Sequence, residues 1–193
     1  MREYGIGKFE KVSFDEFMKS LSRYKTNFSY LLKEDENFVH DMIYDKIQLP
    51  QRATVDSAGY DFFFPFLDDE TINPGETIII PTGIKVNIFH GWHLNLYPRS
   101  GLSFEYPLRL VDTVSIIDGD YYNNPKNEGH IIVKLTNENP SKICKLEQGM
   151  GYLQGIFHEY GVTIDDHVTA TRTGGFGSTT KQKFKRFNPD EEC

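Results

Sequence analysis

The chain has 193 residues, with 21 lysines and arginines against 28 aspartates and glutamates, which gives a formal net charge of −7. This length suffices for one core without a disulfide or metal staple, and the acidic balance argues against non-specific binding of nucleic acid or anionic membranes. Two cysteines outside any paired framework, and an N-terminus without a long apolar run, predict a soluble cytoplasmic protein without a redox centre.

Residues 1–44 are predicted to hold a short strand and one or two amphipathic helices. The strand covers residues 8–12, and Ser13 and Glu16 after it form a capping box, in which each side chain satisfies one exposed N–H group. Two apolar sets then recur at helical spacing: Phe14, Phe17, Met18 and Leu21, then Phe38, Val39, Met42 and Ile43. We expect these faces to pack on the main body of the protein; a surface for a partner protein is the alternative.

Residues 45–168 are predicted to form an all-β domain. Turn signals such as Asn73-Pro74-Gly75 separate short β-rich runs. The runs cover residues 47–49, 60–66, 76–81, 83–88, 92–97 and 131–135. Many short strands with little helix are typical of a sandwich, jelly roll or barrel. Residues 169–193 are predicted to be a flexible arm, because the stretch 169–180 has too little apolar surface to order itself.

An acidic turn follows a β-branched strand at residues 115–122. Ile116 and Ile117 favour an extended backbone, and Gly119 permits a tight turn. Asp118, at the end of the strand, is placed to polarise a water, and Tyr121 is placed to lie against a sugar or a base. Taken alone, Asp-Gly-Asp is most typical of a hairpin turn with solvated side chains, so its meaning depends on the rest of the chain.

Four further glycine-containing blocks accompany this turn. They are residues 57–61 (SAGYD), 98–103 (PRSGLS), 148–154 (QGMGYLQ) and 172–179 (RTGGFGST). Arg99, Ser100 and Gly101 offer a guanidinium, a hydroxyl and close backbone N–H groups, a combination that suits a phosphate. The last block is not a P-loop, because the lysine of that motif is absent. Its single ring, Phe176, indicates stacking on a ligand.

In this order and spacing, the five blocks resemble the five motifs of the trimeric dUTP diphosphatase (dUTPase) family, over residues 47 to 180. The segment 121–131 is similar to the bacterial and bacteriophage branch of that family. The resemblance implies a dUTPase-like jelly-roll or β-clip barrel at residues 45–168. It would carry an N-terminal helical insert and a flexible C-terminal arm, and it would assemble as a homotrimer.

The resemblance also implies hydrolysis of dUTP to dUMP and pyrophosphate, with Mg²⁺ held mainly by the substrate phosphates and no protein metal site. Asp118 falls where the family's general base activates a water for attack on the α-phosphorus. Arg99 falls on the catalytic phosphate side, and Tyr121 falls where a ring packs on deoxyribose. The other substrate-binding positions would be Ser100, Gly101, Asp112, Ile117, Gln154, Arg172, Phe176, Gly177 and Ser178, with Asp61 as a supporting carboxylate near the phosphates.

The chain departs from the family pattern at several positions. Asp112 and Ser115 stand where the third block usually has Asn and Gly, and Met150 and Gly151 stand where many members have Asp and Arg in the fourth. Arg172 is one place nearer the glycines of the fifth block than in most relatives. We expect these positions to alter the detail of base and phosphate binding.

Two alternative functions remain. A dCTP deaminase of the same fold is echoed in residues 129–131, but its catalytic glutamate would fall near Lys134, and its arm lacks the GGFGS block. A nucleotide-controlled regulator that binds other proteins, with or without enzymatic activity, would use the helical insert at residues 13–44.

Overall fold

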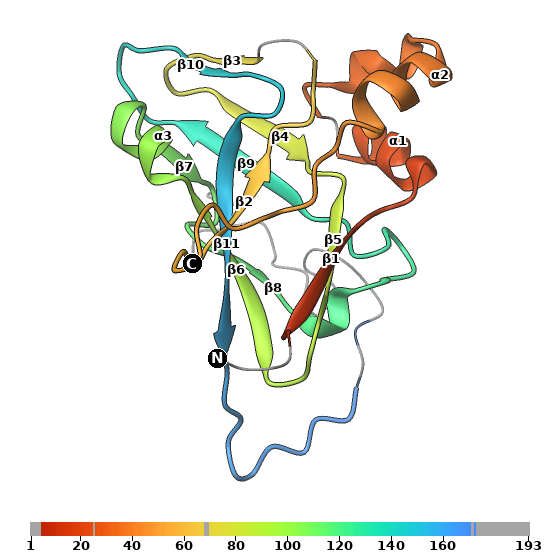
Figure 1. Ribbon diagram of the computed structural model, residues 1–193, viewed down its shortest axis with the longest axis vertical. Helices are drawn as coiled ribbons and strands as arrows, with labels where there is room; N and C mark the ends of the chain where they lie inside the picture. Colours follow the sequence, from red (N-terminus) through yellow and green to blue (C-terminus); the bar gives the residue numbers. More distant parts are fainter. Residues whose placement is uncertain (1–4, 25, 68–69, 171, 173–193) are drawn as a thin grey trace, which may run out of the picture.

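The computed structural model describes residues 5–24, 26–67, 70–170 and 172, and strands predominate in that part of the chain (Figure 1). The strands are β1 (Gly7–Lys11), β2 (Tyr60–Phe63), β3 (Glu70–Ile72), β4 (Thr77–Pro81), β5 (Ile84–Ile88), β6 (Trp92–Pro98), β7 (Leu108–Leu110), β8 (Ser115–Ile117), β9 (Ile132–Asn137), β10 (Cys144–Leu146) and β11 (Gly151–Glu159). All pair antiparallel, as is common in sandwiches and jelly rolls. The predicted all-β fold is confirmed.

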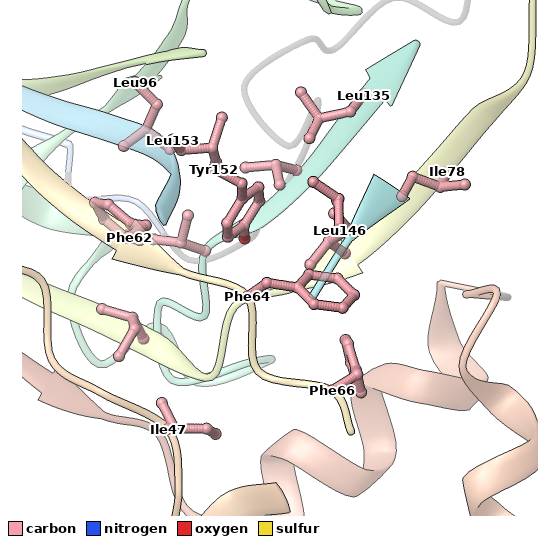
Figure 2. Packing of buried hydrophobic residues seen from close by; sticks show 14 of the residues in the cluster. Ile47, Phe62, Phe64, Phe66, Ile78, Leu96, Leu135, Leu146, Tyr152 and Leu153 are labelled. Atoms are coloured by element: carbon pink, nitrogen blue, oxygen red, sulfur yellow. The ribbon is translucent and has the colours of Figure 1, made fainter. Parts of the chain in front are cut away.

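Two larger sheets organise the strands. One has the order β2-β11-β6-β8 and the other β4-β9-β7, while β1 pairs with β5 and β10 with β3. The inner faces meet in one core that includes Phe62, Phe64 and Tyr152, all at most 1% exposed (Figure 2). Core burial of this extent is the main stabilising term for a chain of this length.

The insert helices and the helix at residues 100–105 lie on opposite sides of the strands (Figure 1). They are α1 (Phe14–Arg23), η1 (Ser29–Lys33), α2 (Glu36–Val39), η2 (His40–Tyr44), α3 (Ser100–Glu105) and η3 (Gly119–Tyr121). The helices α1 and α2 lie together beside β4, and α3 lies against β7 on the other side. None of the helices in the described residues has the length and apolar character needed to span a bilayer.

The insert packs on the strands through one face of α1. Phe17 and Leu21 are fully buried, and the Phe17 ring lies 6.1 Å from that of Phe66. Packing of the first apolar set on the main body is therefore as predicted. The second set is only half buried: Val39 and Ile43 are inside, whereas Phe38 and Met42 are exposed.

The predicted capping box is half correct. Ser13 does cap α1, since its hydroxyl accepts from the Glu16 N–H at 3.1 Å. Glu16 does not return the bond. Its carboxylate is buried and pairs with Arg23 at 2.6 Å, and Glu128 accepts from the Ser13 N–H instead, at 2.9 Å. A residue distant in sequence thus completes the cap.

Several local predictions were wrong. Residues 47–49 lie outside any strand, although Ile47 is buried. Strand β2 stops before residue 64, because Pro65 has no N–H with which to continue a ladder. Residues 100–105 form the helix α3, which was not among the predicted elements.

The Asp-Gly-Asp segment is a single 3₁₀ turn, η3, rather than a hairpin turn. Gly119 is not needed there for a left-handed backbone, since its φ is not positive. It is needed for space: a β-carbon on Gly119 would lie 3.2 Å from the carbonyl oxygen of Ile88.

Candidate active site

The pairing of β8 with β6 delivers Asp118 to the surface. Ile117 is opposite Leu94 in this pair and is itself buried, so the chain leaves the sheet at Asp118. The Asp118 carbonyl accepts from the Tyr121 N–H at 3.1 Å and closes η3. The Asp118 side chain remains 46% exposed, beside a cleft of about 900 Å³ that is also lined by Trp92.

Arg172 reaches this turn from the C-terminal segment. Its Nη2 donates a short hydrogen bond to Asp118 Oδ2, and its Nε donates to Asp120 Oδ1 at 3.1 Å. One guanidinium therefore bridges both carboxylates, an arrangement that suits its planar fork of donors. The third and fifth blocks meet here, and Asp120 is a participant that the motif comparison did not single out.

Tyr121 is fixed beneath this turn. Its side chain is 7% exposed; its hydroxyl donates to the His130 carbonyl at 3.1 Å and accepts from the Asn127 side-chain amide at 2.6 Å. Burial raises the pKa of Tyr121 to about 12, so the hydroxyl remains protonated and keeps donating at neutral pH. The ring is held as a flat apolar surface and not as an acid or base.

The turn that connects β7 in one sheet to β8 in the other carries the two unusual residues of the third block. The Ser115 hydroxyl donates to Asp112 Oδ2 at 2.6 Å, and the Val114 N–H donates to the Asp112 carbonyl at 2.7 Å. Thr113 between them has φ +67°, a left-handed conformation that closes the turn. Ser115 thus gives the Asp112 carboxylate a partner within the same turn. We call Asp112, Ser115, Asp118, Tyr121 and Arg172 the acidic half-site.

The other predicted side chains gather at the far end of β6. Arg99 Nε lies 3.3 Å from Asp61 Oδ1 on β2, and Gln154 on β11 is opposite both Asp61 and Tyr97. Gly59 lets Gln154 approach, since a β-carbon on Gly59 would lie 2.6 Å from the Gln154 Oε1.

Gly151 has a similar spatial role. A β-carbon at this position would collide with the Arg99 guanidinium, so the missing side chain in the fourth block makes room for Arg99. A pocket of about 730 Å³ follows, and its polar lining includes Arg99, Ser100, Lys145, Glu105 and Glu147. The guanidinium, ammonium and hydroxyl groups suit an anion, whereas the two carboxylates oppose one. We call Asp61, Arg99, Ser100, Gly101 and Gln154 the arginine half-site.

The two half-sites lie apart within one copy of the chain. Leu94 pairs with Ile117, so Asp118 is level with His93 at one end of β6, and Arg99 follows the other end of that strand. Six residues of strand at about 3.3 Å each separate them by about 20 Å. The structure therefore brings the predicted residues together in two groups. Phe176, Gly177 and Ser178 lie outside the described residues.

In the described residues, side chains that could together hold a metal ion lie at the end of the insert rather than in either half-site. His40, Asp41 and Asp45 offer ligand atoms within 4.8 Å of one another on η2 and just after it. At the turn η3, Asp118 and Asp120 are oxygen donors of the kind that Mg²⁺ prefers, but both accept from Arg172. Both carboxylates are therefore engaged by a guanidinium in this structure.

Comparison with known proteins gives the family. The model of the dUTPase family matches residues 45–180, and the deoxyuridine 5′-triphosphate nucleotidohydrolase of Lactococcus lactis is 39% identical over 135 residues, 69% of this chain and 88% of that protein. The chain belongs to the dUTPase family. The dUTPase of Streptococcus mutans has a similar structure, with a TM-score of 0.55 and 31% identity over 80% of this chain and 97% of that one.

A phage dUTPase of lower sequence identity resembles this chain in its fold. The dUTPase of Staphylococcus bacteriophage 80alpha is 18% identical, with a TM-score of 0.52 over 68% of this chain and 96% of that one. The predicted family and jelly-roll fold are thus confirmed. The match to the dUTPase family begins at residue 45, so the helices from α1 to η2 precede it.

Proposed function

We propose that the protein hydrolyses dUTP to dUMP and pyrophosphate, and that each active site is completed by half-sites from different copies of the chain in a homotrimer. The observation that carries this proposal is the separation of Asp118 from Arg99 by the length of β6. A base and a phosphate-binding arginine about 20 Å apart do not act on one phosphorus. A second copy supplies the missing half. The names of the bacterial relatives support the reaction.

In this proposal, Asp118 is the general base. Its half-exposed carboxylate accepts a proton from a water as that water attacks the α-phosphorus, and pyrophosphate leaves. The strand β8 and the closed turn η3 hold the carboxylate in place before the reaction. Arg172 moves from the carboxylates to the substrate phosphates, which are the stronger anionic partner.

The arginine half-site binds the phosphates. Arg99 donates from its guanidinium while Asp61 orients it, and Ser100 and Gly101 line the same pocket. Mg²⁺, held by the triphosphate and water, supplies charge neutralisation when bound. The space left by Gly151 keeps Arg99 in its position.

The acidic half-site selects the nucleoside. Tyr121 packs under deoxyribose and leaves no room for a 2′-hydroxyl, because its hydroxyl is tied to the backbone on one side and to Asn127 on the other. The β7–β8 turn that contains Asp112 reads the base. Cytosine would leave two buried groups mismatched, at about 1–3 kcal/mol each, so we expect dCTP to be rejected by a factor of about 30 or more.

Incubation with Mg²⁺ and dUTP, dCTP, dTTP or UTP, followed by chromatography of the products, tests this function. Selective formation of dUMP and pyrophosphate from dUTP is expected. Deamination of dCTP would instead assign the deaminase reaction to this chain. We do not expect that result, because Lys134 on β9 stands where the reaction would need a catalytic glutamate. Sedimentation tests the trimer, and a monomer active at all concentrations would contradict it.

A second candidate function, protein binding by the insert, has an observation of its own. Four large apolar side chains on η1, α2 and η2 remain 41–44% exposed: Tyr30, Leu32, Phe38 and Met42. Phe38→Glu with Met42→Glu is expected to abolish capture of a partner protein and to leave dUTP hydrolysis unchanged. Capture that survives both changes would reject this function.

A further inference from the structure

One buried amide joins the insert to the sugar-contacting ring. The side-chain nitrogen of Asn127 donates to the hydroxyl of Tyr121 at 2.6 Å and to the hydroxyl of Tyr24 at 3.0 Å. Tyr24 is the residue that ends α1, and Asn127 is 2% exposed. An amide nitrogen has two N–H groups, so these two tyrosines account for both.

The residue that accepts from the Tyr121 hydroxyl also contacts α1. The His130 carbonyl accepts from Tyr121, and the His130 ring is fully buried. Its Nε2 accepts from the Gly83 N–H at 2.8 Å, which places its proton on Nδ1. That Nδ1 lies 3.8 Å from the carboxylate of Glu16 on α1. Asn127 and His130, which both bond the Tyr121 hydroxyl, therefore also contact α1 or the residue that caps it.

The end of α1 also borders the β7–β8 turn of the acidic half-site. A pocket of about 520 Å³ lies between them, and its walls include Arg23 and Tyr24 from the insert and Val111 and Asp112 from the turn. The helix thus lies next to both elements that contact the nucleoside in the proposed function, although it precedes the region that matches the dUTPase family.

We propose that Tyr24 is a positioning residue for Tyr121, and that α1 in this way contributes to the discrimination between deoxyribonucleotides and ribonucleotides. The proposal rests on the proposed function, in which Tyr121 packs on the sugar. Without the Tyr24 hydroxyl, one buried N–H of Asn127 loses its acceptor, and the amide turns to find another. The Tyr121 ring then loses a fixed partner, and a tilted ring admits a 2′-hydroxyl.

The test is Tyr24→Phe, with Tyr44→Phe as a matched control. Tyr44 is also an insert tyrosine with a bonded hydroxyl, which donates to the Val12 carbonyl at 2.6 Å, away from Tyr121. We expect Tyr24→Phe to lower the preference for dUTP over UTP, as the ratio of kcat/KM, by about 3- to 10-fold. The change should come mainly from a lower KM for UTP and a higher KM for dUTP. Tyr44→Phe should leave the ratio unchanged.

Equilibrium binding of dUMP and UMP, measured in parallel by calorimetry, separates the possible failures. A wild-type protein that binds both nucleotides but hydrolyses no dUTP would refute the proposed function. The ratio of the dUMP and UMP affinities in wild type and Tyr24→Phe would still test the positioning role of Tyr24. An active Tyr24→Phe variant with the wild-type ratio would overturn the positioning role alone. Equal losses in Tyr24→Phe and Tyr44→Phe would also overturn it, because a general weakening of the insert would then be sufficient.

Discussion

The two half-sites differ in how the chain brings their residues together. The acidic half-site lies almost entirely within residues 112–130, where the end of one strand, a helical turn and a loop hold the groups by local hydrogen bonds; only Arg172 comes from elsewhere. The arginine half-site draws Asp61 and Gln154 from the adjacent strands β2 and β11, and Arg99 from the position just after β6. The first depends on local turns and the second on strand register, so they respond differently to substitution.

Asp118→Asn removes the base and has the largest expected effect. The amide keeps the shape of the side chain, so dUTP binding should be retained, whereas kcat should fall by about 10²- to 10⁴-fold. Asp120→Asn is the matched control, since Asp120 accepts from the same guanidinium but does not follow the strand. An equal loss in kcat for both variants would show that the Arg172 bridge, and not the base, was removed.

Mixing two inactive variants tests whether the half-sites meet between copies. Asp118→Asn and Arg99→Ala each disable one half of every site. If the halves come from different copies, co-refolded mixtures should regain up to about a quarter of wild-type kcat at random assembly. Each variant refolded alone is the control. Activity that never rises above either variant alone would place both residues in the site of a single copy.

Gly151→Ala tests the arginine half-site at its most crowded point. The added β-carbon would displace the Arg99 guanidinium, and loss of a charge-assisted phosphate contact should lower kcat/KM by about tenfold or more, largely through KM. Gly161→Ala is the control, because nothing lies within 4 Å of its β-carbon position. Unchanged kcat/KM in a folded Gly151→Ala protein would show that Arg99 does not bind the phosphates.

The contrast between the half-sites also explains what the sequence could predict. Asp118, Tyr121 and Arg99 stand in short motifs with strong chemistry, so the family and the jelly-roll fold followed from them. The interactions that hold them come from residues without such a signal. Asn127 bonds Tyr121 from within a loop, and Glu128 replaces Glu16 in the cap of α1 because Glu16 is turned inward.

The predictions of short elements were wrong for a different reason. The helix α3 and the turn η3 are each only one to two turns long, too short to show a periodicity. The distance between the half-sites depends on the register of β6 with β8, which no motif encodes. The order of the motifs predicted one site for all these residues. The strand register shows that a single copy of the chain holds them in two places.

The smallest expected effect concerns the pH dependence of stability at the base of the acidic half-site. Burial lowers the pKa of His130, so the ring is neutral in the folded protein and protonates near pH 6.5 when unfolded. Its stabilising contribution is therefore present above about pH 6.5 and is lost as the pH falls below that value. Glu16 opposes this shift and Arg23 adds to it.

His130→Gln keeps an acceptor for the Gly83 N–H and removes the titration. The difference in Tm between wild type and this variant should become more favourable to the variant from pH 7.5 to pH 5.5, by a few degrees. His90→Gln, at an exposed position, is the control for the same change of residue type. Parallel curves of Tm against pH for wild type and His130→Gln would show that the buried His130 ring does not cause the pH dependence of stability. The carboxylates of Glu16 and Glu128 would then be the next groups to replace.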